Sequence, residues 1–222
     1  MEDIQIVDLF DLEESVAGTY LFGYQYPWEA LGSIEDMILQ IGPMLDKATY
    51  TEVKEHVWIA NSASVYETAC INGPAIIDEE AQIRHCAFIR GNAIIGKNAV
   101  VGNSTELKNV ILFNGVQVPH YNYVGDSILG YKSHMGAGSI TSNVKSDKSL
   151  VCIKNETESI PTNRKKVGAF LGDNVEIGCN SVLNPGTVIG RNSIVYPLSM
   201  VRHIVAKDSI YKGKNEIIKK EI

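Results

Sequence analysis

From residue 59 onward, an aliphatic residue recurs every six positions, and no other feature of the sequence constrains the fold as strongly. The interval stays at six from Ile59 to Leu107, drops to five at three later steps, and is six again from Leu171 to Val201. An α-helix would place residues six apart on different faces, and a flat strand would show a period of two. The pattern therefore predicts an all-β chain of short strands and tight turns, wound into a parallel β-helix whose coils cover one another. The inward positions are Ile59, Val65, Ile71, Ile77, Ile83, Ile89, Ile95, Val101, Leu107, Leu112, Val118, Val124, Leu129, Met135, Ile140, Leu171, Ile177, Leu183, Ile189, Val195 and Val201.

Residues 1–55 lack this period. Two segments, 9–18 and 27–45, have the composition of short helices, with Pro27 suited to a helix start and Gly18 to a helix end. An open end of a β-helix exposes apolar core and unpaired strand edges. We therefore expect residues 1–55 to form a helical cap over one end, with a role in shaping the substrate site as the alternative.

Two further segments depart from the pattern. The polar stretch 141–168 interrupts the coils and is expected to be an inserted loop or hairpin that projects from the β-helix. The tail 209–222 is rich in lysine and is expected to form a solvated C-terminal helix. The β-helix itself is thus predicted to span residues 56–208.

Composition excludes several classes of protein. The chain has 222 residues with a net charge of −6, so nucleic acid is not an expected ligand. Its start is acidic and no apolar run is long enough to cross a bilayer, which predicts a cytoplasmic protein. The four cysteines are too scattered for a zinc site or a disulfide framework, and no metal is expected. They are Cys70, Cys86, Cys152 and Cys179.

Two cationic residues are separated by three six-residue repeats. If a coil contains three repeats, as the family resemblance described below implies, the side chains of Arg90 and Lys108 lie one above the other. Two stacked cations without an acidic partner at the same angle favour an anion between them, and a phosphate is the natural candidate. Glu106 lies on the same strand face as Lys108 and could contact a sugar hydroxyl or an amine.

His120 is the candidate general base, because its side chain titrates near neutral pH. It lies in the segment VPHYNYVGDSILGYKSHMGAGSITSN, three residues before Tyr123. A structural role is the alternative for a lone histidine on a strand, so the surrounding motif has to decide between the two.

That motif resembles the hexapeptide-repeat acyltransferases, and in particular the acetyltransferase domain of bifunctional N-acetylglucosamine-1-phosphate uridyltransferases. The likeness covers about residues 57–205, and the 141–168 insertion is similar to that of archaeal-type sugar-1-phosphate acetyltransferases. The resemblance rests on the ordered set Arg90, Lys108, His120, Tyr123, Ala137 and Asn143.

The family fold is a left-handed parallel β-helix with three six-residue repeats in each coil. Residues one coil apart should then stack directly on one another inside the β-helix. One expected internal row consists of Ile59, Ile77, Ile95 and Phe113.

The resemblance implies acetyl transfer from acetyl-CoA to the amine of a hexosamine 1-phosphate, either glucosamine or galactosamine 1-phosphate. Position by position, Arg90 and Lys108 would bind the phosphate and His120 would deprotonate the amine. Backbone near Ala137 would bind the thioester oxygen. The other implied contacts are Glu106, Tyr123 and Asn143 with the sugar, and Cys179, where family members often carry serine, with CoA.

The resemblance also implies a homotrimer whose sites lie between neighbouring β-helices. No Gly-rich nucleotidyltransferase loop precedes the β-helix, so we expect no nucleotidyltransferase activity in this chain. Three alternatives remain: acyl transfer to another acceptor such as a nucleotide-linked amino sugar, a non-catalytic assembly subunit, and a γ-class carbonic anhydrase. The last is disfavoured because Gly125 occupies the position of the third zinc-binding histidine.

Overall fold

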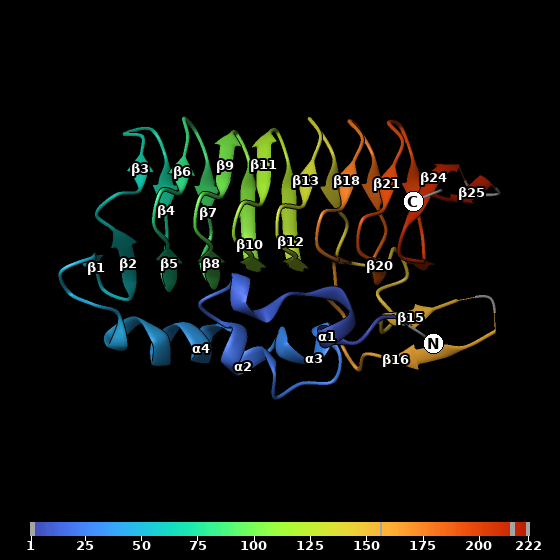
Figure 1. The fold of residues 1–222 in the computed structure, drawn as a ribbon, viewed down its shortest axis with the longest axis horizontal. Helices are drawn as coiled ribbons and strands as arrows, with labels where there is room; N and C mark the ends of the chain where they lie inside the picture. Colours follow the sequence, from blue (N-terminus) through green and yellow to red (C-terminus); the bar gives the residue numbers. More distant parts are fainter. Residues whose placement is uncertain (1–2, 156, 214–215, 221–222) are drawn as a thin grey trace.

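The computed structural model describes residues 3–155, 157–213 and 216–220, and its main body is the predicted parallel β-helix (Figure 1). Three faces are formed by strands of successive coils, each paired in parallel with the strand one coil away. The first face contains β2 (Val57–Ala60), β5 (Ala75–Ile77), β8 (Ala93–Ile95), β17 (Ala169–Leu171), β20 (Thr187–Ile189) and β23 (Ile204–Val205). The second contains β3 (Ser64–Val65), β6 (Gln82–Ile83), β9 (Val100–Asn103), β11 (Gln117–His120), β13 (His134–Met135), β18 (Glu176–Ile177), β21 (Ile194–Val195) and β24 (Ser209–Gly213). The third contains β4 (Cys70–Ile71), β7 (Phe88–Ile89), β14 (Ile140–Thr141), β19 (Val182–Leu183) and β22 (Met200–Val201).

Two long strands turn the corner from the third face to the first. They are β10 (Glu106–Leu112) and β12 (Tyr123–Leu129), and each bends at a polar residue with positive φ, Asn109 at 56° and Asp126 at 49°. Asparagine and aspartate tolerate this left-handed conformation better than other non-glycine residues. The corner of these two coils is therefore built from polar side chains.

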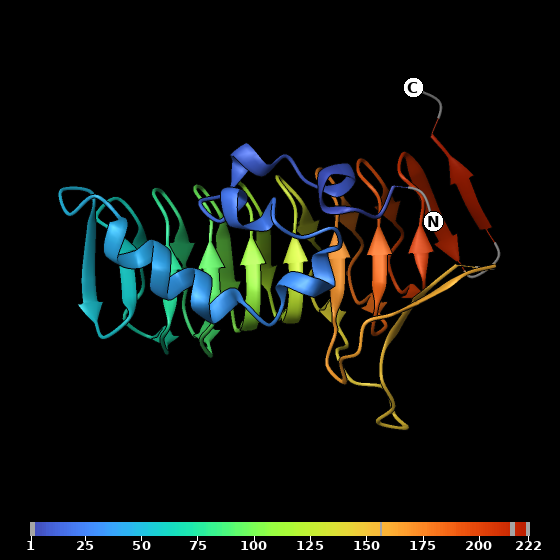
Figure 2. The same cartoon turned by 90° about the horizontal axis from the view of Figure 1, so that it is seen from below.

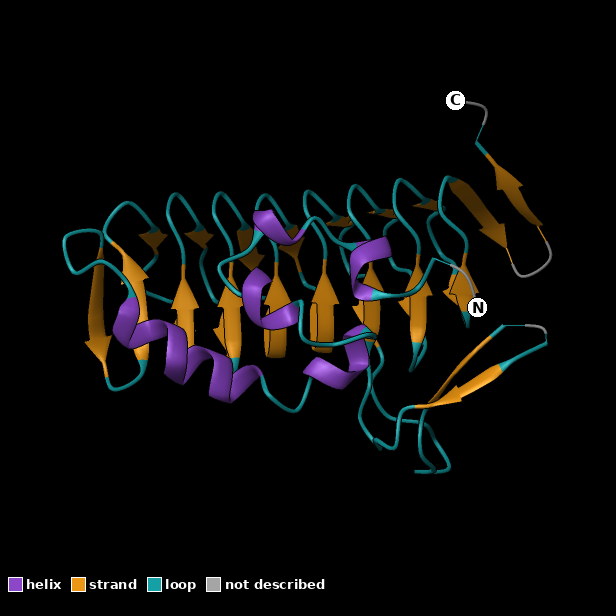
Figure 3. Ribbon diagram, turned by 60° about the horizontal axis from the view of Figure 1, so that its bottom comes forward, coloured by secondary structure: helices purple, strands orange, loops and turns teal. Residues whose placement is uncertain are grey.

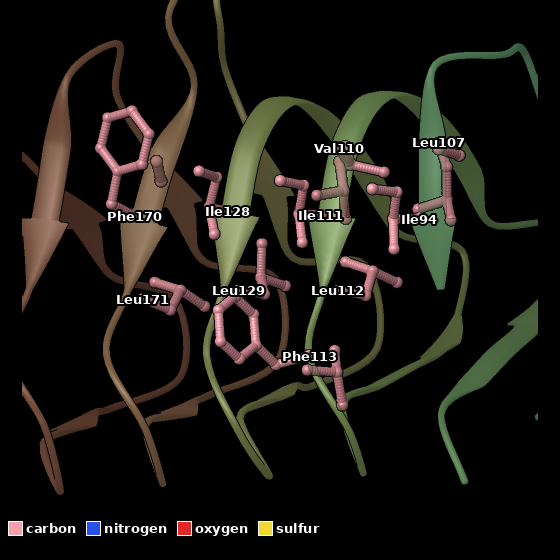
Figure 4. Close-up of a cluster of buried hydrophobic side chains, with 14 of the residues drawn as sticks. Ile94, Leu107, Val110, Ile111, Leu112, Phe113, Ile128, Leu129, Phe170 and Leu171 are labelled. Atoms are coloured by element: carbon pink, nitrogen blue, oxygen red, sulfur yellow. The ribbon is translucent and has the colours of Figure 1, made fainter. Parts of the chain in front are cut away.

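Coil length is not constant. Ala75 pairs with Ala93, a full three repeats later, whereas the next partner of Ala93 is Val110, one residue short of a full coil. The expectation that Phe113 stacks on Ile95 is therefore wrong, and Leu112 takes that place. The interval of five residues before Leu112 in the sequence corresponds to this shortened coil. Figure 4 shows the aliphatic rows that result.

The helical segment before the β-helix does not cap an end. It runs along the first face, as Figures 2 and 3 show. Its contacts extend from Gly42, packed on the ring of Trp58, to Trp28, whose ring lies 6.0 Å from that of Phe170. The outward side chains of this face are apolar and need this cover. The helices are α1 (Ile6–Leu9), η1 (Leu12–Glu14), α2 (Gly18–Leu21), α3 (Pro27–Ala30), α4 (Ile34–Ile41) and η2 (Gly42–Met44).

Within this cover, the two predicted helices are each broken into shorter ones. Gly18 begins α2 rather than ending a helix. Strand β1 (Tyr50–Lys54) then pairs antiparallel with β2 and covers the first edge of the β-helix. The longest helix, α4, buries residues 34, 37, 38 and 41, the spacing of one helix face.

The insertion forms an antiparallel hairpin of β15 (Cys152–Lys154) and β16 (Ser159–Pro161). It leaves the β-helix after β14, at the corner of the third and first faces. Its two ends meet there, because the N–H of Val167 donates to the carbonyl of Asn143 at 3.0 Å. The extra residues thus leave the stacking of coils uninterrupted, and Tyr123, Ile140 and Val182 follow one another in register.

The predicted C-terminal helix is wrong. In the described part of the tail, β25 (Glu216–Lys219) pairs antiparallel with β24 and covers the last edge of the second face. The adjacent Ile217 and Ile218, followed by two lysines, fit a strand as well as a helix, and an available sheet edge decides for the strand.

Candidate functional site

The stacked cations are present, but each has an acidic partner. Arg90 and Lys108 lie in successive coils, with Phe88 opposite Glu106 in the register of β7 and β10. The guanidinium of Arg90 is 2.7 Å from the carboxylate of Glu106, and the ammonium of Lys108 is 2.9 Å from that of Asp126. The expectation of two uncompensated cations is therefore wrong. The bond to Glu106 also raises the pKa of Arg90 above its ordinary value.

Asp126 is the centre of this corner. It is 4 % exposed, and its carboxylate accepts from Lys108 at 2.9 Å, from Asn109 at 3.0 Å and from Asn143 at 2.6 Å. A buried carboxylate is tolerated only with such a set of donors. The side chain of Asn109 also donates to the carbonyl of Leu31, at 3.1 Å, in the helical cover. The cover is thus tied directly to the corner.

Tyr123 joins the same group of side chains. Its hydroxyl accepts from Asn143 at 3.2 Å. A Cβ at Gly125 would lie 2.5 Å from this hydroxyl, so glycine is required for the position of the phenol. Burial, followed by the charge of Asp126, raises the pKa of Tyr123, which keeps the phenol protonated and able to donate. We call this group the Asp126 cluster; it consists of Arg90, Glu106, Lys108, Asn109, Tyr123, Asp126 and Asn143.

His120 lies at the next corner, between the second and third faces. The N–H of Gly138 donates to its carbonyl at 3.0 Å. Its own N–H donates to Asn122 at 3.1 Å, and the buried Asn122 amide also bonds to the carbonyls of Gly136 and Ser139. Among the described residues, the imidazole of His120 has no hydrogen-bond partner, so its side chain is open to a ligand.

The predicted CoA residues follow His120 along the same edge. The N–H of Asn180 donates to the carbonyl of Ala137, and that of Leu198 to the carbonyl of Cys179, so both residues occupy the equivalent place in successive coils. Within the described part of the chain, the N–H of Ala137 makes no hydrogen bond. We call this row the His120 edge; it consists of His120, Ala137 and Cys179.

Sequence reasoning brought together most of this site but missed three polar residues. Asp126 follows Lys108 by 18 residues, the same number that separates Lys108 from Arg90, and this was the available signal. Asn109 and Asn122 have no comparable signal, because their roles depend on a corner and on contacts with distant segments. The predicted residues Arg90, Glu106, Lys108, Tyr123 and Asn143 lie together, with His120, Ala137 and Cys179 along the neighbouring edge.

Other features bear on the alternatives. Among the described residues, no group of three or more His, Cys, Asp or Glu side chains could hold a metal ion. His134 lies on the second face, where its Nδ1 is 2.8 Å from the carboxylate of Glu176.

No helix in the described ranges is long and apolar enough to cross a membrane.

Two family models match the β-helix. Residues 71–159 match the model described as the GMPPB C-terminal domain, which includes both the Asp126 cluster and His120. Residues 168–203 match the model described as bacterial transferase hexapeptide (six repeats). These matches agree with the six-residue period and with the coils it forms.

Curated relatives are similar over different lengths. The bifunctional protein GlmU of Methanocaldococcus jannaschii is 33 % identical over 94 % of this chain and 52 % of that protein. GlmU of Methanococcus aeolicus is 37 % identical over 52 % of this chain and 28 % of that protein. The bifunctional sugar-1-phosphate nucleotidylyltransferase/acetyltransferase of Sulfurisphaera tokodaii is 33 % identical over 49 % of this chain and 27 % of that protein. The chain thus spans about half, or less, of the length of these relatives.

Proposed function

We propose that this hexapeptide-repeat protein is an acetyl-CoA-dependent N-acetyltransferase that acts on the amine of a hexosamine 1-phosphate. The observation that carries the proposal is the Asp126 cluster, in which side chains from successive coils gather beside the coil that bears His120. The names of the relatives, which include a sugar-1-phosphate acetyltransferase, support the same reaction class.

The chain keeps the two corners close together. His120 and Tyr123 are three residues apart, so their Cα atoms lie within roughly 11 Å of each other. A hexosamine with its phosphate at the cluster would bring its amine toward His120. In this pose, Tyr123 and Asn143 contact the sugar ring.

The reaction needs one proton transfer and one acyl transfer. His120 removes a proton from the amine, whose nitrogen forms a bond to the thioester carbon. The oxyanion that develops is stabilised by the N–H of Ala137, a donor that no other described group uses. The C–S bond then breaks, and the CoA thiolate takes the proton from His120. Cys179, further along this edge, would contact the CoA chain.

Charge compensation assigns different tasks to the two cations. Lys108 is held by the buried Asp126 and stays in place, whereas the pair of Arg90 and Glu106 is about 45 % and 35 % exposed. Exposed ion pairs contribute little stability, so a phosphate can replace Glu106 as the partner of Arg90 at small cost. Glu106 is then released toward the sugar hydroxyls or the amine.

The proposal includes assembly into a homotrimer, in which a neighbouring chain completes the open His120 edge. It also includes the absence of nucleotidyltransferase activity in this chain. Both stay predictions.

The test is a substrate panel. We would incubate the protein with acetyl-CoA and glucosamine 1-phosphate, galactosamine 1-phosphate, glucosamine 6-phosphate or free glucosamine, and follow release of the CoA thiol. The 1-phosphates should be acetylated and free glucosamine should be a poor acceptor. Arg90→Gln should raise KM for the 1-phosphate by the equivalent of about 1.5–3 kcal/mol, the value of a charge-assisted hydrogen bond, with little effect on acetyl-CoA.

Arg84→Gln is the matched control, because Arg84 is bonded to Gln82 on the second face and lies outside the cluster. It should leave KM for the sugar unchanged. The proposed reaction is wrong if no amino sugar of the panel releases thiol. The phosphate assignment is wrong if Arg90→Gln and Arg84→Gln behave alike.

A further inference from the structure

A polar pocket lies where the insertion meets the last coils. Its volume is about 480 Å³, which is in the range of small-molecule sites. One wall comes from the insertion, between Ser142 and Lys154, and the other from the turns after β19 and β22, with Asn184, Arg202 and His203. In Figure 2 the hairpin of β15 and β16 lies beside these last coils.

Positive charge prevails in this pocket. Lys145, Lys154, Arg202 and His203 line it, and Asp147 is the acidic residue among its lining side chains. Asp147 lies 3.7 Å from Lys145 and so offsets that lysine. Within the described ranges, the side chains of Lys154, Arg202 and His203 make no hydrogen bond or ion pair. The pocket thus retains positive charge that no described protein group neutralises.

The pKa of His203 is affected by the same positive charges. Burial, and then the charges of Lys154 and Arg202, lower the pKa of its imidazole below the ordinary value of 6.5. Lys154 thus lies close to Arg202 and His203, although the insertion and the last coils are far apart in the sequence. An anion between them would relieve the repulsion and provide the missing hydrogen-bond acceptors.

We propose that this basic pocket, formed by Lys154, Arg202 and His203, binds the phosphate of a phosphorylated small molecule. A phosphate presents several acceptor oxygens to donors from different directions, whereas a carboxylate presents two. The volume admits a nucleotide-sized ligand. The pocket contains none of the residues that carry the proposed acetyl transfer, so phosphate binding here can be measured separately from that reaction.

The basic pocket lies next to the Asp126 cluster, which bears on the source of the phosphate. Ser142 and Val144 line the pocket, while Asn143 between them bonds to Asp126 and Tyr123. The pocket therefore continues from the Asp126 cluster along the same corner, about one or two strand spacings of ~4.8 Å away. The phosphate could belong to the acceptor, as in a nucleotide-linked sugar, to CoA, or to a separate nucleotide.

The experiment uses the full chain and inorganic phosphate as the first probe. NMR of the histidine ring protons would follow His203, identified by its loss in His203→Asn; asparagine tolerates the φ of 70° at this position. Phosphate should shift the His203 signals and raise the pKa of its imidazole. Arg202→Gln should weaken phosphate binding about tenfold or more, as expected for a charge-assisted bond.

Lys207→Ala is the matched control, because Lys207 is an exposed lysine paired with Asp3 and lies outside the pocket lining. It should leave the phosphate affinity unchanged. The proposal is overturned if phosphate leaves His203 unperturbed, or if Lys207→Ala weakens binding as much as Arg202→Gln does.

Further arms distinguish the source of the phosphate. Coenzyme A, a nucleoside diphosphate and glucosamine 1-phosphate would each be titrated by calorimetry into the wild type and Arg202→Gln. The ligand whose affinity falls in the variant is the one that uses the pocket. If none of the three loses affinity, although inorganic phosphate binds, the pocket takes an adventitious ion only and the inference fails. Because binding is read without turnover, this result is independent of the panel that tests acetyl transfer.

Discussion

The Asp126 cluster and the basic pocket lie along one corner of the β-helix but differ in charge compensation. In the cluster, Lys108 and Arg90 are each within 3 Å of a carboxylate, and Asp126 is almost fully buried. In the pocket, Lys154 and Arg202 are exposed and have no acidic partner within the described residues. One region is organised before a ligand arrives, whereas the other has charge available for it.

This difference assigns the two regions different tasks. In the cluster, Lys108 keeps a fixed partner in Asp126, and a phosphate can bind only by replacing Glu106 as the partner of Arg90. An uncompensated pocket gains most from a dianion. Positive residues at a common angle of a β-helix are therefore insufficient to identify a phosphate site; the carboxylates one coil away have to be counted as well.

The largest expected effect is the loss of turnover when His120 is replaced. His120→Ala should reduce kcat by a factor of about 10²–10⁴, since it removes the proposed general base, and should leave the affinity for acetyl-CoA nearly unchanged. Steady-state kinetics with the 1-phosphate acceptors would measure the first quantity and calorimetry the second. The phosphate response of His203 should be unaltered.

His85→Ala provides the control for this variant. His85 lies on the same edge, but its ring is bonded to Thr68 at 3.0 Å and packs on Tyr66, which indicates a structural role. Its replacement should leave kcat within a factor of a few. If His120→Ala also retains activity within such a factor, His120 is structural and the proposed reaction lacks its base.

A smaller effect, on stability, is expected from a substitution in the Asp126 cluster. Asp126→Asn preserves the backbone conformation but leaves Lys108 without its anion and places an amide against the Asn143 donor. Breaking a buried pair in this way should lower the free energy of unfolding by about 2–4 kcal/mol, with the exposed part of Lys108 reducing the effect. Denaturant unfolding at a fixed protein concentration would measure it.

In the basic pocket, the matched substitution should leave the free energy of unfolding nearly unchanged. Arg202→Gln should alter the free energy of unfolding by less than about 0.5 kcal/mol, because the exposed side chain has no described partner to lose. Equal destabilisation by Asp126→Asn and Arg202→Gln would remove the distinction between the two regions.

The smallest effect is a pH dependence at His203. Its pKa is lowered in the folded chain, so the unfolded chain takes up a proton first as the pH falls below about 6.5. The stability contributed by the neutral imidazole is therefore present above pH 6.5 and is lost as the pH falls toward the folded pKa. The groups facing His203 are Lys154 and Arg202, with Lys145 and Asp147 across the pocket.

Unfolding of the wild type and His203→Asn at pH 7.5, 6.5 and 5.5 would isolate this contribution. The wild type should lose more stability over this range than the variant, and phosphate should reduce the loss by stabilising the imidazolium. Identical pH profiles for the two proteins, with and without phosphate, would contradict this account of the pocket.

Much of the fold was predictable because the chain repeats one local rule. An aliphatic residue every six positions requires short strands around a shared core, and the intervals of five already record the shortened coils. The helical cover was foreseen in composition but not in position. The sequence does contain a signal for the position of the cover. Four isoleucines each come directly before an inward residue on a strand and so must point outward: Ile76, Ile94, Ile111 and Ile128. A face of buried isoleucines needs a cover, and all four are fully buried.

The tail illustrates the opposite case. Its lysine and isoleucine pattern fits either a solvated helix or a strand, and only the free edge of β24 determined the outcome. Local preference was too weak to decide between them, because hydrogen bonds to the preceding strand β24, which the β-helix holds in place, contribute as much as the propensity difference does.

The sequence by itself determined the parallel β-helix and the stacking of Arg90 and Lys108, because positions three repeats apart return to the same angle of a coil. The places of Tyr123 and Asn143 beside them were implied by the family resemblance. The tertiary structure alone decided the state of their charges. Whether Asp126 reaches Lys108 depends on a corner with positive φ and on Asn109, which is held from Leu31 in the cover. Likewise, Lys154 and Arg202 meet only because the insertion folds back on the last coils. Such contacts join residues far apart in the chain, and no local period encodes them.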